Sequence, residues 1–262
     1  MLTNRLSNGN KSSSTQDGLV VVVMRVPRKF MVDIVKHTLF SKVGVMGRDY
    51  GQYCGLARAL DVIGDRWNLL IVRQLLLGPA RYGDLREALS GIATNLLAGR
   101  LRDLEAAGVM ERRLSEGGNA IIYALTPWGA ELREPINGLI RWSTPLMIRG
   151  PEDDAFRPEW MSLALAALFT GRVPVGQTAA VNVSVADDCI QLRATPTGID
   201  VGLPDGRDVD AVLSADAPIV LGLAAGVLTI DAIAPAVVMD GDIAALRAIF
   251  QAPRATAGLS KT

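Results

Sequence analysis

The sequence predicts an α+β protein with two folded domains, because the spacing of its apolar residues changes once along the chain. Over residues 50–149 the apolar residues recur every three or four positions, as in helices, and one hairpin follows. Over residues 155–252 they first alternate with polar residues, as in an antiparallel sheet, and then return to helical spacing. The length of 262 residues and the 49% apolar content are typical of a globular protein of about two domains.

Four helices are predicted in the first domain, and a glycine ends each of them. They lie within residues 54–64, 67–78, 85–91 and 94–108. Only a tight turn fits between the third and the fourth, and two helices joined in this way form a helix-turn-helix. The inward stripe of the fourth helix consists of Leu97, Leu101 and Leu104.

A hairpin is predicted directly after the fourth helix. Val109–Leu114 and Ala120–Leu125 flank the segment Ser115–Asn119, whose two glycines and asparagine suit a tip with positive φ. A hairpin in this place is a wing, so the first domain is predicted to be a winged helix-turn-helix.

A long helix is predicted after the wing, where Thr126 supplies an N-cap and Pro127 the first helical residue. Pro135 is expected to kink this helix or to split it. So long an apolar helix, with two tryptophans, predicts a homodimer interface, and packing on its own domain is the alternative. The candidate interface residues are Trp128, Leu132, Ile136, Leu139 and Trp142.

The outer face of the fourth helix carries the candidate base-reading residues. Asn95 is able to pair with adenine and Arg102 with guanine, while Ala98 permits contact with a thymine methyl group. Four arginines are the candidates for phosphate contacts, and for each the alternative is a solvated surface position. The candidate DNA-binding residues are Thr94, Asn95, Ala98, Gly99, Arg100, Arg102, Arg81, Arg112 and Arg113.

The net charge of zero hides an asymmetry along the chain. Residues 1–49 carry 8 basic and 3 acidic side chains, and residues 50–150 carry 12 and 10. Residues 151–262 carry 7 basic and 14 acidic side chains, which makes this half a poor binder of polyanions. Any contact with nucleic acid therefore belongs to the earlier part of the chain.

Residues 50–148 resemble the HxlR family of bacterial winged-helix transcriptional regulators. The resemblance implies a homodimer that binds operator DNA with inverted-repeat half-sites. The sequence departs from the family at Gly55, where proline is usual, and at Asp65-Arg66, where Gly-Lys is usual. Ala93 replaces a small hydroxyl residue, so Thr94 is expected to cap the fourth helix. The residues that carry the resemblance are Cys54, Leu60, Ile63-Gly64-Asp65-Arg66-Trp67, Leu75-Leu76-Leu77-Gly78, Arg81-Tyr82-Gly83-Asp84-Leu85, Gly91-Ile92, Leu97, Leu101, Leu104 and Gly108.

Cys54 is a candidate thiol sensor, since some members of the HxlR family use a cysteine at this position to sense electrophiles or oxidants. Such chemistry needs an exposed thiolate whose pKa is lowered by a cation or a helix N-terminus. Cys54 precedes the first helix and Arg58 lies one turn further on. The alternative is an unreactive cysteine, which is also the interpretation for Cys189 in its strand-like context.

The second domain follows a linker at residues 150–154 and begins with a buried helix over 158–170. Four strands of an antiparallel sheet are predicted around Val181–Val185, Ile190–Ala194, Ile199–Leu203 and Val209–Leu213. Helical segments are expected at Pro218–Ala225, Ala232–Val237 and Asp242–Phe250.

This half resembles the sterol carrier protein type 2 fold, through Asp210–Asp216, Gly226 with Asp231, and Met239–Asp242 followed by Ala245-Leu246. The resemblance implies a lipid-carrier-like domain with an apolar tunnel, and plain core is the alternative for its lining. The candidate lining residues are Leu165, Phe169, Leu221, Leu223, Ile230 and Ile233.

Residues 1–49 are predicted to lie outside the folded domains, and so is a flexible tail at 253–262. From residue 43 to residue 260 every basic residue is arginine, whereas lysines stand at positions 11, 29, 36 and 42. We therefore expect translation to start at Met46, so that residues 1–45 are an over-extended reading frame. A genuine disordered arm is the alternative.

Several function classes are excluded by what the sequence lacks. A single histidine, His37, rules out most histidine-based metal sites and catalytic triads, and no phosphate-binding glycine loop occurs. We therefore expect no catalytic residue, metal, cofactor or enzymatic activity. Two cysteines make no disulfide framework, and the apolar stretch at 19–26 is too short to cross a membrane, so a cytoplasmic location is expected.

The sequence as a whole predicts a dimeric, DNA-binding transcriptional regulator, a repressor by resemblance. Its second domain is expected to bind an apolar ligand, such as a lipid, or to strengthen the dimer. One alternative is a lipid-binding carrier whose winged helix contacts proteins. The other is a regulator that senses oxidants or electrophiles through Cys54.

Overall fold

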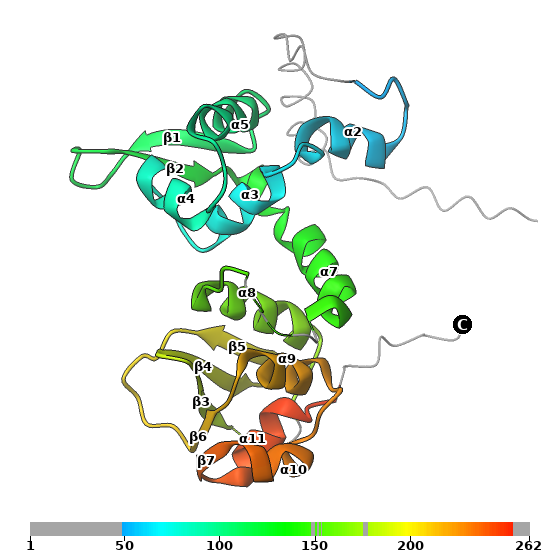
Figure 1. Cartoon of the computed structure of the whole chain (residues 1–262), viewed down its shortest axis with the longest axis vertical. Coiled ribbons are helices and arrows are strands. Elements are labelled where there is room, and N and C mark those ends of the chain that lie inside the picture. Colours follow the sequence, from blue (N-terminus) through cyan, green and yellow to red (C-terminus); the bar gives the residue numbers. More distant parts are fainter. Residues whose placement is uncertain (1–48, 148–149, 151, 153, 175–177, 254–262) are drawn as a thin grey trace, which may run out of the picture. The chain divides into compact units, whose positions relative to one another are not determined.

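A computed structural model describes residues 49–147, 150, 152, 154–174 and 178–253 (Figure 1). The expected start at Met46 and the expected extension, up to residue 48, lie outside the described residues. So do parts of the predicted linker and all of the predicted tail beyond Pro253. Among the described helices, none is long and apolar enough to cross a membrane.

The four predicted helices of the first domain are present, although the third lies at 82–88 and not within 85–91. They are α2 (Gly55–Ile63), α3 (Asn68–Leu76), α4 (Tyr82–Ala88) and α5 (Thr94–Ala106). The predicted stripe of α5 is buried in one apolar cluster, together with side chains of α3, α4 and the wing. This burial fixes which face of α5 points outward. The α5 stripe and the α3 members of this cluster are Leu97, Leu101, Leu104, Ile71, Val72 and Leu75.

The predicted wing consists of β1 (Met110–Leu114) and β2 (Ile121–Leu125), which pair antiparallel. The segment between α3 and α4 adds one bridge to this hairpin, because the main chains of Ala80 and Tyr123 exchange hydrogen bonds of 3.0 and 2.8 Å. The wing is therefore attached to the helix-turn-helix through its backbone as well as through its apolar face.

The long helix after the wing is split, as the sequence predicts, into α6 (Pro127–Ala130) and α7 (Arg133–Ser143). The break comes before Pro135, which lies in the first turn of α7, where a missing backbone N–H costs little. The start of α6 is capped and packed against the wing. Thr126 caps α6 by accepting a 3.0 Å hydrogen bond from the Gly129 amide. A Cβ at Gly129 would stand 1.9 Å from the Val109 carbonyl oxygen, so α6 lies directly against the start of the wing. A short 3₁₀ turn, Thr144–Met147, follows α7.

The second domain combines helices with one five-stranded sheet. Its strands lie in the spatial order β5-β4-β3-β6-β7 (Figure 1). Its elements are α8 (Pro158–Phe169), β3 (Ala180–Val185), β4 (Asp188–Thr195), β5 (Gly198–Gly202), β6 (Ala211–Ser214), α9 (Ala217–Ala225), α10 (Ile230–Ile233), a 3₁₀ turn (Ala234–Ala236), β7 (Val238–Gly241) and α11 (Ile243–Phe250).

The predicted all-antiparallel sheet is wrong for one pair of strands. β3 and β6 run parallel, in a register from Val181 opposite Ala211 to Ser184 opposite Ser214. The turn residues after β5 suggest a hairpin, yet the chain does not turn back on β5. It crosses the two neighbouring strands and enters the sheet beside β3.

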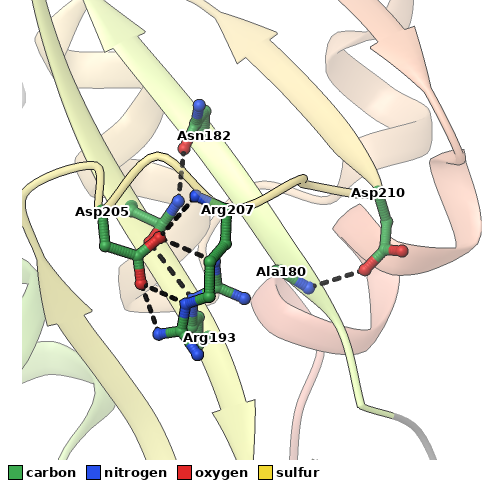
Figure 2. A network of polar contacts seen from close by, with 7 residues as sticks. Ala180, Asn182, Arg193, Asp205, Arg207 and Asp210 are labelled. Carbon is green, nitrogen blue, oxygen red and sulfur yellow. Dashed lines mark hydrogen bonds and ion pairs between the residues drawn. The ribbon is translucent and has the colours of Figure 1, made fainter.

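Strand register explains how so short a connection makes this crossing. Gly202 at the end of β5 lies opposite Gln191, which in turn lies opposite Asn182 on β3. β5 therefore ends at the level where β6 begins, and residues 203–210 need only run across the sheet. At the far side Asp210 accepts a 2.8 Å hydrogen bond from the amide of Ala180 (Figure 2).

A polar network holds the crossing segment on the face of β4. Asp205 accepts a 3.0 Å hydrogen bond from Arg193 and is also paired with Arg207 (Figure 2). Arg193 donates a second hydrogen bond, of 3.1 Å, to the buried Gln191. The hydrogen bonds from Arg207 first, and then those from Arg193, hold the pKa of the Asp205 carboxyl well below its usual range.

β7 is the strand that the sequence did not predict. It is four residues long and its first residue, Val238, is exposed, so neither length nor alternation marks it. Gly241 permits its pairing with β6, because a Cβ there would stand 2.3 Å from the Asp210 carbonyl oxygen. The expected helix at 232–237 is correspondingly shorter: it consists of the end of α10 and the 3₁₀ turn.

All four helices of the second domain contribute to a core against one face of the sheet. The six predicted ligand-lining residues belong to this core. They are buried in it, between 0% and 7% exposed, among one another and the apolar residues of β3, β4 and β6. Such burial is expected of a plain core and of the lining of an enclosed tunnel, so the predicted lining stays a prediction.

α8 also contacts the helices of the first domain. The Arg73 guanidinium lies 3.9 Å from the centre of the Trp160 ring, and Trp160 donates a 3.1 Å hydrogen bond to Gln74. Burial lowers the pKa of Arg73 to about 10. Arg157 donates a 3.0 Å hydrogen bond to the Glu87 carbonyl oxygen at the end of α4.

We predict that Leu165→Ala lowers the free energy of unfolding by about 2–5 kcal/mol, the usual loss for a leucine enclosed in a core. Urea unfolding followed by circular dichroism measures this loss. Leu203→Ala is the control, because Leu203 is 78% exposed, and it should change the free energy by less than about 0.5 kcal/mol. A loss below about 1 kcal/mol for Leu165→Ala would mean that this side chain borders an open cavity.

Candidate nucleic-acid interface

The exposed face of α5 carries the predicted base-reading residues. Thr94, Asn95 and Arg102 are exposed, and Ala98 and Gly99 are half-buried. Arg102 makes no hydrogen bond or ion pair with any other described residue, so its guanidinium is available to a ligand. Within the described chain this distinguishes it from the other arginines of α5 and the wing.

The first turn of α5 differs from the prediction in one respect. The N-cap is Ala93, with extended backbone angles, and Thr94 is already the first helical residue. Thr94 therefore does not cap the helix, and no side chain does. The carbonyl oxygen of the Asn95 side chain accepts a 2.9 Å hydrogen bond from the Leu96 amide.

Arg100, a predicted phosphate contact, is engaged within the protein. Its Nη1 lies 2.6 Å from a carboxylate oxygen of Asp65 and 3.3 Å from one of Asp103. Its side chain is 21% exposed. These contacts point to a structural role for Arg100 between α5 and the turn that precedes α3.

The predicted phosphate contacts of the wing also have acidic neighbours. Arg112 pairs with Glu105 at 2.9 Å and Arg113 with Glu111 at 3.4 Å. All four side chains keep between 31% and 53% of their surface exposed, so these pairs are solvent-screened and weak. Arg81 is exposed before α4; its backbone amide donates a 2.9 Å hydrogen bond to Asp84, and its carbonyl oxygen accepts one of 3.1 Å from the Leu85 amide.

The structure adds surface residues that sequence reasoning missed. Leu114 and Ile121 lie opposite each other near the tip of the wing and are 66% and 55% exposed. Both lie next to the predicted tip Ser115–Asn119, at the end of the hairpin away from the buried Met110. Tyr82 was also missed: its hydroxyl donates a 2.8 Å hydrogen bond to the Thr94 carbonyl oxygen.

The predicted dimer residues fall into two groups. Ile136 is buried in its own domain and Leu132 is packed against the same core, as the alternative interpretation expected. Leu139 and Trp142 are 47% and 76% exposed, and Trp128 is 40% exposed. The 3₁₀ turn after α7 extends this apolar surface through Leu146, which is 73% exposed.

Cys54 is the exposed N-cap of α2. The backbone amides of Ala57 first, and then Leu56, at the start of α2, lower the pKa of its thiol. Arg58 is not the cause, because its guanidinium pairs with Asp49 at 3.0 Å and with Asp61 at 3.2 Å. Cys189 is a free, half-buried cysteine on β4. In the described part of the chain no three His, Cys, Asp or Glu side chains are grouped so as to hold a metal ion.

Residues 62–149 match the model of the HxlR-like helix-turn-helix family. The transcriptional regulator sll1512 of Synechocystis is 34% identical over 84 residues, which are 32% of this chain and 62% of that protein. YodB of Bacillus subtilis, another HTH-type transcriptional regulator, is 35% identical over 86 residues, which are 32% of this chain and 77% of YodB. The chain belongs to the HxlR-like helix-turn-helix family.

This family assignment makes DNA binding and transcription regulation the function class of the first domain. It also argues against an enzyme, since the relatives are transcriptional regulators. A solved structure of quinone-bound YodB from B. subtilis has 32% identity, covers 34% of this chain and 93% of that chain, and has a TM-score of 0.30. The family match extends over residues 62–149, which include α3 to α5 and the wing of this HxlR-like chain.

We predict that Cys54 is alkylated by iodoacetamide at pH 7 faster than Cys189, because its lowered pKa gives more thiolate and its side chain is exposed. Mass spectrometry of the variants Cys54→Ser and Cys189→Ser, each with one remaining thiol, gives the two rates. Equal rates in the folded variants would show that the amides of α2 do not activate Cys54.

Proposed function

We propose that this chain is a dimeric repressor that binds operator DNA through the outer face of α5. The observation that carries the proposal is the free guanidinium of Arg102, on the same exposed face as Asn95. Arginine and asparagine are the side chains that pair bidentately with guanine and adenine in the major groove. The small residues Ala98 and Gly99, between them, allow the helix to approach the bases closely.

The dimensions of α5 support this mode of binding. It has 13 residues, which gives a length of about 20 Å, and a major groove about 12 Å wide admits such a helix. The turn between α4 and α5 leaves the first turn of α5 accessible, since Thr94 and Asn95 are exposed. In helix-turn-helix proteins this end of the recognition helix contacts the bases.

The charge of the first domain supports a dimer, because a single copy has few arginines that are free to contact phosphates. Residues 50–150 carry a net charge of only +2, and three of the proposed phosphate contacts lie beside carboxylates. Two copies would double the phosphate contacts, and affinity should fall steeply with salt. Repression, rather than activation, is proposed on the resemblance to the HxlR family.

The proposed dimer surface consists of the exposed apolar residues of α7 and the turn that follows it. Trp142, Leu139, Leu146 and Met147 are 76%, 47%, 73% and 51% exposed. Large apolar residues that are exposed together on two consecutive elements are typical of protein–protein contacts. A tryptophan such as Trp142, when buried in an interface, often contributes a large share of the binding free energy.

A second candidate function is sensing of electrophiles or oxidants by Cys54. The exposed thiol at the N-cap of α2, with its lowered pKa, favours this function. Oxidation or alkylation there would change the charge and size of a side chain beside Leu56, a 68% exposed residue of the same helix. An apolar ligand in the second domain stays a prediction, and its six candidate lining residues are buried together in the core of that domain.

We predict that Arg102→Ala lowers affinity for the preferred DNA sequence by roughly 1–3 kcal/mol and relaxes preference at one base position. Sequence selection from a random duplex pool, followed by fluorescence anisotropy, measures both effects. Arg86→Ala is the control, since Arg86 is an exposed arginine of α4 and its loss removes the same charge. If the base preference of Arg102→Ala equals that of the wild type, Arg102 does not read bases.

We predict that Trp142→Glu converts the dimer to a monomer, because a carboxylate would replace the largest exposed apolar side chain of the proposed surface. Analytical ultracentrifugation gives the mass of the wild type and the variant. Leu203→Glu is a matched control at another exposed position, with 78% exposure. A variant that sediments as a dimer would place the interface elsewhere.

A further inference from the structure

An ion pair joins α5 to the turn between α2 and α3. The Nη1 atom of Arg100 lies 2.6 Å from Asp65 Oδ2, although the two residues are 35 positions apart in the sequence. Asp65 follows Gly64, which caps α2, and precedes Trp67, the N-cap of α3. The pair therefore ties the proposed base-reading helix to a different part of the fold.

Arg100 is directed into the protein and away from solvent. Its side chain is 21% exposed, against 55% for that of Asp103, which is its second partner, at 3.3 Å, within α5. Its Nε atom is buried and makes no hydrogen bond with the described residues. An arginine held in this way has little freedom to reach a phosphate.

The turn that presents Asp65 is itself fixed on both sides. The Gly64 amide donates a 2.9 Å hydrogen bond to Leu60, and a Cβ at Gly64 would stand 2.4 Å from the same carbonyl oxygen. Trp67 adopts a φ of 84°, in the left-handed region, which a non-glycine residue adopts only when its surroundings impose it. The buried Asn68 donates a 3.0 Å hydrogen bond to the Val62 carbonyl oxygen and so joins α3 to the end of α2.

A second contact holds the other end of the reading face. The Tyr82 hydroxyl donates its proton to the Thr94 carbonyl oxygen at 2.8 Å, so it has no proton left for a phosphate. α5 has no side-chain cap of its own, and this bond from α4 fixes its first turn instead. Both contacts come from elements outside α5.

We propose that Asp65, acting through Arg100, is a positioning residue for sequence readout by α5. The proposal rests on the proposed function. Bidentate contacts to base edges demand a fixed position and rotation of the helix that presents them. The leucine stripe holds α5 in the core by non-directional contacts, whereas an ion pair across to a rigid turn fixes its rotation about its own axis.

Substitution of Asp65 by asparagine separates positioning from general electrostatics. Asp65→Asn removes one negative charge, which by itself strengthens binding to every DNA sequence. Loss of the link to Arg100 instead weakens binding only to the preferred DNA sequence, because only there do base contacts contribute to affinity. On the preferred sequence, removal of the charge raises affinity and loss of the link lowers it. A net loss of affinity on that sequence alone therefore reports the loss of the link.

The full chain selects a preferred sequence from a random pool of DNA duplexes. Fluorescence anisotropy then gives the affinity of each variant for that sequence and for calf thymus DNA. We expect Asp65→Asn to bind the selected sequence roughly threefold to tenfold more weakly, the effect of one partly buried ion pair, and calf thymus DNA at least as well as the wild type. Asp103→Asn is the matched control: it removes the same charge beside the same arginine but leaves the link between elements, and it should not weaken either affinity.

A second variant tests the other contact without any change of charge. Tyr82→Phe removes only the hydroxyl, and it should show the same selective loss, while Tyr123→Phe, on the wing, should bind like the wild type. Circular dichroism at the assay temperature confirms that each variant is folded.

The outcomes distinguish the two levels of the proposal. If the wild type selects no sequence, the proposed function fails. If it does select one, and Asp65→Asn binds that sequence as well as or better than the wild type, the positioning role of Asp65 is overturned. An equal loss of affinity for both DNAs overturns it as well, because the effect is then not one on readout.

Discussion

Burial of three leucines of α5 is the constraint on which the winged helix-turn-helix depends. Leu97, Leu101 and Leu104 are 2% exposed or less, and they share one apolar core with residues of α3, α4 and the wing. Because these positions follow helical spacing, their burial leaves the opposite face of α5 in solvent. The proposed base-reading residues Asn95 and Arg102 lie on that face for this reason. The same core anchors the wing, through residues at its base, such as Met110.

Electrostatics divides the arginines of this domain by role. Arg100 is mostly enclosed and lies beside two carboxylates, Arg112 and Arg113 each lie beside one, and Arg102 has no partner among the described residues. An enclosed ion pair is screened by water less than an exposed one. Separation from its carboxylate partners therefore costs Arg100 more interaction free energy than it costs Arg112 or Arg113. The exposed wing pairs exchange with solvent easily and are able to give up a carboxylate for a phosphate. Charge counting alone treats all four as equivalent.

The second domain depends on a different constraint, which is the crossing of residues 203–210 over the sheet. The parallel pairing of β3 with β6 requires this crossing, and the network of Asp205 with Arg193 and Arg207 holds it (Figure 2). The helices cover the other face and fill it with apolar side chains, including all six candidate ligand-lining residues. The domain is held together as one core, and its acidic surface is unsuited to DNA.

The sequence by itself determined the elements whose signals are local. Helical spacing and glycine stops predicted α2 to α5, and the Gly-Gly-Asn tip predicted the wing, because these patterns depend on residues near one another in the chain. Only the tertiary structure decided the parallel pairing of β3 with β6, the existence of β7 and the engagement of Arg100 by Asp65. Each of these joins residues far apart in the sequence, and the energy of such a contact depends on geometry that no local pattern encodes. The burial of Ile136 beside the exposure of Trp142 belongs to the same group, since both continue one apolar stripe and only packing separates them.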